Sequence, residues 1–196
     1  MQLLLATNLG QSEAAVRVQL GAVRQRLKAA TGRAKITVTE AVYALGVTPA
    51  QWSSLRQAAW QPDGFIGADE EVSALCAQLH RRFRLAFGTN NAVPVGLRIL
   101  ELVGIHDAAP DVPVFGPENL GVSKPEPAFY ATIAQRLGAP PAACLSVGDR
   151  EWSDGPPALA AGYAAAIIVP GSRAEFVQAA RCLLDDNWRE ELESYI

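Results

Sequence analysis

The stretch that most constrains this chain covers residues 121–169, where helix and strand patterns alternate. An amphipathic helix is expected between Pro127, in its first turn, and Gly138, which ends it. Its apolar face repeats at four-residue spacing, at Phe129, Ile133 and Leu137. Strands are expected on either side of a second, small-residue helix, and this alternation predicts a parallel α/β sheet.

An acidic loop follows the strand expected over residues 144–147. That run is apolar and short, as is typical of a buried parallel strand. Gly148 and Asp149 come directly after it, and Asp154 follows in the same loop. Ligands of open parallel sheets bind outside the carboxyl ends of the strands, and carboxylates there suit a hard cation. Asp149 and Asp154 are therefore the candidate metal ligands.

These features resemble the haloacid dehalogenase (HAD) superfamily of phosphatases, dehalogenases and related phosphotransferases. The resemblance is carried by Lys124-Pro125 before the helix, by Gly148-Asp149 after the strand and by Asp154, in that order. It implies an α/β fold with a three-layer, Rossmann-like core of parallel strands and an inserted helical cap. It also implies Mg²⁺ bound by Asp149 and Asp154.

The N-terminal motif departs from the family pattern. Residues 3–6 are expected to form the first strand, and the resemblance then matches the next turn to Asp-x-Asp-Gly-Thr, with Gly10 fixing the register. Thr7 takes the place of the nucleophilic aspartate, and Leu9 that of the aspartate that acts as general acid and base. Threonine needs an adjacent base and leucine transfers no proton, so these catalytic positions are predicted to be degenerate. With one anionic ligand fewer, Mg²⁺ is expected to bind weakly or not at all.

The remaining site residues are expected at other strand ends. A strand over residues 84–88 would deliver Thr89 and Asn90, and the resemblance implies that Thr89 binds a phosphoryl oxygen with Asn90 beside it. A third strand is expected over residues 112–115, and Lys124 lies in the chain that follows it. The resemblance implies that the Lys124 ammonium faces the phosphate as a point charge. The plainer alternatives are that Thr89 caps the next helix and that Lys124 is solvated.

Residues 12–83 are predicted to form the helical cap, so that the core comprises residues 1–11 and 84–196. Residues 39–57 also resemble a helix-turn-helix, but the helix that would enter DNA carries only Arg56, whereas DNA affinity rests on several cations. The large aromatics of this region either line the cleft between cap and core or fill the interior of the cap. They are Trp52, Trp60 and Phe65.

Charge and composition restrict the partners further. The chain has 196 residues and a formal net charge of -3, which argues against nucleic acid and anionic membranes. Its three cysteines are far apart and odd in number, so no disulfide framework is predicted. The N-terminus has too short an apolar run for a signal peptide, so a cytoplasmic protein is expected. Trp188 and Tyr195 can pack back on the core or meet a second copy, which leaves a homodimer open.

Two functions follow from this pattern. In the first, a HAD-like hydrolase scaffold without its reacting aspartates is catalytically impaired and binds a small phosphorylated or anionic molecule, or a partner protein. The binding residues would be Thr89, Asn90, Lys124, Asp149 and Asp154. In the second, the protein is an active small-molecule phosphatase or hydrolase that uses Thr7 or a metal-bound water.

Overall fold

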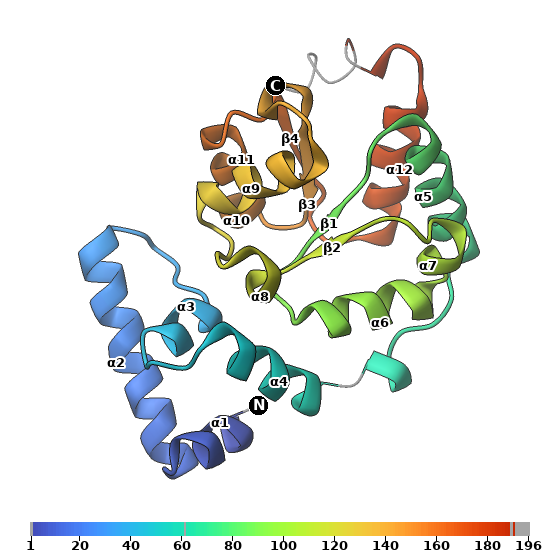
Figure 1. Cartoon of the computed structure of the whole chain (residues 1–196). Coiled ribbons are helices and arrows are strands. Elements are labelled where there is room, and N and C mark those ends of the chain that lie inside the picture. The colour runs from blue at the N-terminus through green and yellow to red at the C-terminus, as the bar shows by residue number, and fades with distance from the viewer. Residues whose placement is uncertain (1, 61, 189, 191–196) are drawn as a thin grey trace.

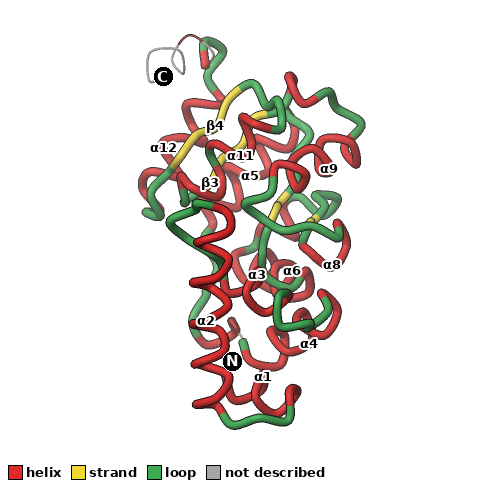
Figure 2. Tube along the Cα trace, turned by 90° about the vertical axis from the view of Figure 1, so that its left-hand side faces the viewer, coloured by secondary structure: helices red, strands yellow, loops and turns green. Residues whose placement is uncertain are grey.

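A group of N-terminal helices stands beside an α/β core in the computed structural model, which describes residues 2–60, 62–188 and 190 (Figure 1). The N-terminal helices are α1 (Gln2–Leu9), α2 (Glu13–Thr31), α3 (Val38–Tyr43) and α4 (Pro49–Ala59). Seen from the side, they form the lower part of an elongated molecule, and the strands lie in its upper part (Figure 2). We call α1–α4 the cap.

Local capping signals fix the ends of the cap helices. The Ser12 hydroxyl accepts a hydrogen bond from the backbone N–H of Ala15 at the start of α2, and Gly32 ends that helix with a φ of 69°. At α4, Thr48 forms a reciprocal capping box with Gln51, and Pro49 lies in the first turn. The cap is therefore helical where the sequence predicted helices.

The predicted N-terminal strand is wrong, because residues 3–6 lie within α1. A short apolar run fits a buried strand or a buried helix equally well, so packing decides between them. Here the helix buries Leu5 and Ala6 against the other cap helices. Their apolar cluster also contains Val16, Val42, Val47 and Trp52. Residues 2–9 thus pack with the cap and do not begin the sheet.

The core strands pair in parallel, as predicted, but they are short. Strand β1 (Phe87–Gly88) pairs with β2 (Val114–Phe115), and β3 (Leu145–Gly148) pairs with β4 (Ala165–Ile168). Among the described residues these strands form two separate two-stranded sheets. The strands predicted over residues 84–88, 112–115 and 144–147 match β1, β2 and β3 within a few residues, and β4 follows the small-residue helix as predicted.

Helices connect and cover the strands. The α-helices of this part are α5 (Glu70–Arg82), α6 (Val93–Val103), α7 (Ile105–Ala108), α8 (Pro117–Leu120), α9 (Pro127–Leu137), α10 (Glu151–Asp154), α11 (Pro156–Ala160) and α12 (Arg173–Leu184). Two 3₁₀ turns, η1 (Pro62–Gly64) and η2 (Pro141–Ala143), complete the described elements. The helix predicted from Pro127, with Gly138 as its end, is confirmed.

Both sheets lie between the same two layers of helices. On one side, α5 and α12 form an apolar cluster that Leu85 and Leu145 join from the strands or their edges. On the other side, α9 forms a cluster that Ala86 and Cys144 join. Neighbouring residues of an extended chain point to opposite faces, so this alternation defines a three-layer α/β core. The predicted fold class is confirmed.

Helix α5 packs with the core, although the predicted cap extended to residue 83. Its apolar face, with Leu75 and Leu79, meets α12, and Arg173 of α12 forms an ion pair with Asp69 at the start of α5. Trp188 packs back on Phe83, with ring centroids 5.8 Å apart. Tyr195 lies outside the described residues, so the homodimer stays a prediction.

No helix in the described part of the chain is long and apolar enough to cross a bilayer.

Candidate functional site

A cavity of about 990 Å³ lies between the cap and the carboxyl ends of β1 and β3. Its core wall includes Thr89, Asn90, Lys124, Asp149, Arg150 and Asp154. Its cap wall includes Arg24, Lys28, Lys35, Trp52 and Arg56. The structure therefore brings together the five core residues predicted from sequence, with a cap wall that the sequence did not specify.

Lys124 and Asp154 form the central ion pair of this cavity. The Lys124 Nζ lies 2.6 Å from Asp154 Oδ1, and the two side chains are 18% and 3% exposed. The other carboxylate oxygen accepts a hydrogen bond from the backbone N–H of Arg150 at 3.1 Å. The Tyr130 hydroxyl lies 3.2 Å from Oδ1 and 2.5 Å from the carbonyl oxygen of Ser153. Asp154 is thus a buried carboxylate whose charge is already compensated.

Tyr130 stays protonated beside this pair. Burial, and then the negative charge of Asp154, raise the pKa of its phenol far above the ordinary value of 10.0. The hydroxyl therefore remains a hydrogen-bond donor at every physiological pH. Its shorter contact is with the Ser153 carbonyl oxygen, so it holds the backbone beside Asp154 and lies next to the carboxylate that pairs with Lys124.

Gly148 permits Asp154 to fold back onto the end of β3. A Cβ at position 148 would lie 2.3 Å from the Asp154 Cβ and 2.7 Å from its Oδ2, far inside any real contact. The glycine of the Gly148-Asp149 motif is therefore required for close packing of the buried carboxylate.

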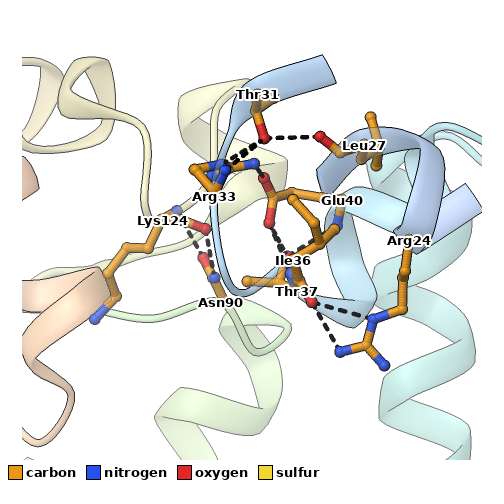
Figure 3. Close-up of polar contacts among 9 residues, drawn as sticks. All are labelled: Arg24, Leu27, Thr31, Arg33, Ile36, Thr37, Glu40, Asn90 and Lys124. Carbon is orange, nitrogen blue, oxygen red and sulfur yellow. Dashed lines mark hydrogen bonds and ion pairs between the residues drawn. The ribbon is translucent and has the colours of Figure 1, made fainter. Parts of the chain in front are cut away.

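Asn90 positions the backbone of Lys124. Its Oδ1 accepts a hydrogen bond from the Lys124 N–H, and its Nδ2 donates to the Lys124 carbonyl oxygen, both at 2.9 Å (Figure 3). The sequence placed Asn90 among the phosphate-binding residues. In the structure both polar atoms of its side chain are bonded to the Lys124 backbone.

The Thr89 hydroxyl, at the end of β1, has a proton available for donation. Its Oγ1 accepts a hydrogen bond from the N–H of Asn91 at 2.9 Å, and its own N–H donates to the carbonyl oxygen of Phe115. Helix α6 begins after Ala92 without a side-chain cap, so Thr89 does not serve as the cap of that helix. The hydroxyl proton can be donated to an oxygen of a ligand.

Arg56 joins the cap to the same loop, a role that sequence reasoning missed. From α4 its guanidinium donates to the carbonyl oxygen of Asn90 at 2.9 Å and to the side-chain oxygen of Asn91. It also lies over the Trp52 ring, 5.7 Å from the centroid. Burial lowers the pKa of Arg56, but an arginine remains charged in proteins. The signal available in the sequence was that Arg56 is the one cation of its helix.

A second contact between cap and core runs through Glu118 of α8. Its carboxylate accepts hydrogen bonds from the Ser53 hydroxyl of α4, at 2.9 Å, and from the backbone N–H of Val93. Burial, followed by the nearby charge of Glu118, raises the pKa of Tyr43 to about 12. The cap is therefore attached to the core at two positions of α4, Ser53 and Arg56.

The two predicted metal ligands differ in their surroundings. The Asp149 side chain is 58% exposed and lies 3.6 Å from the Arg150 guanidinium, a pair of the weak surface type. Asp154 already meets an ammonium, a phenol and a backbone N–H. In the described chain no three His, Cys, Asp or Glu side chains are grouped so as to hold a metal. As arranged, these residues do not fit a magnesium site, which needs several free oxygen ligands.

Thr7 and Leu9 do not line the cavity, contrary to the roles predicted for them. Both lie on α1, where Thr7 is exposed and Leu9 packs against the apolar cluster of the cap. The prediction depended on a strand ending at Ala6, and the helix removes that basis. Their match to the nucleophile and acid–base positions therefore has no structural support.

The fold and this cavity define a capped α/β protein with a cationic cleft at the strand ends. A family model described as haloacid dehalogenase-like hydrolase matches residues 6–162. The chain belongs to this family of HAD-like hydrolases, and the predicted resemblance is confirmed. No curated protein sequence matches the chain.

Two solved structures illustrate the likeness. A HAD family hydrolase from Deinococcus radiodurans R1, with bound phosphate and sodium, is 23% identical over 82% of this chain and 80% of that one, with a TM-score of 0.45. A HAD phosphatase from Thermococcus onnurineus is 21% identical over 88% of this chain and 77% of its own, with a TM-score of 0.48. Similarity at this level concerns the fold alone.

Proposed function

We propose that this protein binds a small phosphorylated or otherwise anionic molecule in the cavity, and that its phosphoaspartate chemistry is impaired. One observation carries the proposal. The chain has 17 Lys and Arg against 20 Asp and Glu, yet the cavity wall holds six of the cations and only two of the carboxylates. An acidic protein that gathers cations in one cavity creates a local potential that favours an anion.

Lys124 and Thr89 are the groups that would contact the anion. An ammonium has three N–H donors, and Asp154 accepts from Lys124 at one oxygen, so further donors remain for a ligand. Thr89 adds a hydroxyl donor from the next strand end. Charge-assisted hydrogen bonds of this kind contribute about 1.5–3 kcal/mol each.

Impaired turnover follows from the state of the carboxylates. A nucleophilic aspartate needs a free oxygen facing the substrate. Asp154 is buried and bonded to three donors, and Asp149 is exposed beside Arg150. Neither is paired with a second free carboxylate that could act as general acid and base.

The family match favours a second candidate, hydrolysis of a small phosphate ester. Members of this family usually use Mg²⁺, and Asp149 is the more accessible of the two carboxylates. A hydrolase mechanism in which Thr7 is the nucleophile loses its support, because Thr7 does not line the cavity. The route through a metal-bound water would require Asp154 and Asp149 to release Lys124 and Arg150, and the turnover assay below tests it.

Calorimetric titration with inorganic phosphate and with 4-nitrophenyl phosphate tests the proposal. Lys124→Gln keeps a hydrogen-bonding group for Asp154 but removes the charge, and should weaken phosphate binding about tenfold or more. Arg26→Ala is the matched control, because Arg26 is exposed on α2 and does not line the cavity. Binding that is absent in the natural protein, or equal in Lys124→Gln, would refute the proposal.

Release of 4-nitrophenol in the same samples, with and without Mg²⁺, distinguishes the two candidates. Impaired chemistry predicts no turnover above that of buffer. Turnover that requires Mg²⁺ and disappears in Asp149→Asn would establish the hydrolase and contradict the impairment.

A further inference from the structure

The six cations of the cavity differ in whether they already have a partner in the described part of the chain, and the two without one both lie on the cap wall. Lys124 on the core wall is paired with Asp154, and Arg56 is bonded to the loop of Asn90. On the cap wall, neither Lys28 nor Lys35 has a hydrogen bond or ion pair between its ammonium group and another residue in the described part of the chain. The cap thus presents two uncompensated positive charges to the cavity.

The backbone that carries Lys35 is held firmly. The segment between α2 and α3 is tied by Arg24, whose guanidinium donates to the carbonyl oxygen of Ile36 at 2.8 and 3.1 Å (Figure 3). It is tied again by Arg33, which pairs with Glu40. Thr37 closes a capping box with the same glutamate (Figure 3). Lys35 is therefore presented from a fixed position, whereas a lysine on a free loop would cost more ordering on binding.

Lys35 also faces a continuation of the cavity. A second hollow of about 620 Å³ adjoins the first and shares Lys35, Asp149, Arg150 and Trp152 with it. Clefts of this size accommodate whole metabolites, whereas an isolated phosphate fills only a small part of them. A ligand that reaches both walls must therefore extend well beyond one phosphate group.

We propose that the ligand is a small molecule with two separated anionic groups, such as a bisphosphate or a phosphate with a distant carboxylate. This inference rests on the proposed function. One anionic group binds at Lys124 and Thr89, and the other binds at Lys28 and Lys35. Both ammonium groups line the cavity without a partner in the described part of the chain, so a second anion there adds a favourable charge interaction.

Fructose 6-phosphate and fructose 1,6-bisphosphate are matched probes, since they differ only in the second phosphate. Calorimetry should show single-site binding of both, with the bisphosphate tighter by about tenfold or more at low salt. In the variant with Lys28→Ala and Lys35→Ala, the ratio of the two affinities should fall to near one. The matched control carries Arg17→Ala and Arg26→Ala, which remove the same charge from exposed positions of α2 outside the cavity lining and should leave the ratio unchanged.

The outcomes separate this inference from the proposed function. If neither probe nor inorganic phosphate binds, the proposed function fails, and this inference fails with it. If all three bind with equal affinity, or if the control variant lowers the ratio as much as the Lys28 and Lys35 variant does, the anion site stands and the second subsite is refuted.

Discussion

Replacing Gly148 by alanine tests whether Asp154 folds back onto the end of β3. The new Cβ would lie 2.3 Å from the Asp154 Cβ and 2.5 Å from its Cγ. Since carbon atoms in contact stay about 3.5–4.0 Å apart, the aspartate has to move by more than about 1 Å. It cannot do so without lengthening its bonds to Lys124 and to the Arg150 N–H.

The cost of this change has two parts. Forcing an extra methyl group into a packed site costs about 1–3 kcal/mol. Loss of a charge-assisted hydrogen bond from the displaced carboxylate costs about 1.5–3 kcal/mol more. We therefore expect Gly148→Ala to lower the free energy of unfolding by about 2.5–6 kcal/mol, a large share of the stability of a typical domain. Phosphate binding should weaken as well, because Lys124 loses the partner that orients it.

Urea unfolding followed by circular dichroism measures this change. Gly21→Ala is a suitable control, because Gly21 lies inside α2 with open space where its Cβ would be. Alanine is the better helix former, so this variant should gain about 0.5–1 kcal/mol. If Gly148→Ala unfolds within about 0.5 kcal/mol of the natural protein, as surface substitutions do, Asp154 does not occupy the position described here.

Two further predictions follow from other parts of the structure. Restoring aspartates with Thr7→Asp and Leu9→Asp should give no phosphatase activity, because both positions lie on α1 outside the cavity; release of 4-nitrophenol above that of the natural protein would show that α1 does reach the site. Burial raises the pKa of Tyr43 and of Tyr163 from 10.0 to about 12. The folded state therefore holds these protons more tightly than the unfolded state, so their contribution to stability is complete below pH 10 and is lost as the pH rises toward 12. A urea midpoint that stays constant over that interval would contradict the burial of these phenols.

The C-terminal part of the fold could be predicted because its signals are local. Pro127 and Gly138 define α9 through the backbone conformations that they favour, and such preferences need no tertiary context. The strands before and after α11, β3 and β4, could be predicted because each is a short apolar run bounded by residues that end helices.

The N-terminus and the details of the site could not be predicted in this way. Leu5 and Ala6 satisfy a helix or a strand equally, and only their contacts with Val16 and Trp52 decide. The sequence places Lys124 and Asp154 thirty residues apart, and nothing local shows that they bind each other instead of a ligand and a metal. From the sequence, Arg56 served only as an argument against DNA binding, because its helix has no other cation, and its bond to the Asn90 loop could not be predicted.

Hydrogen bonds from Arg56 to Asn90 and from Asn90 to Lys124 connect the cap to the core. Any hinge motion that lifts α4 away from the core must either break the bonds of Arg56 or drag the loop of Asn90 with it. Because Asn90 in that loop is bonded to both the N–H and the carbonyl oxygen of Lys124, displacement of the loop shifts the backbone that carries the Lys124 ammonium. The cap can therefore open without moving the Lys124 backbone only if the bonds of Arg56 to the Asn90 loop break first.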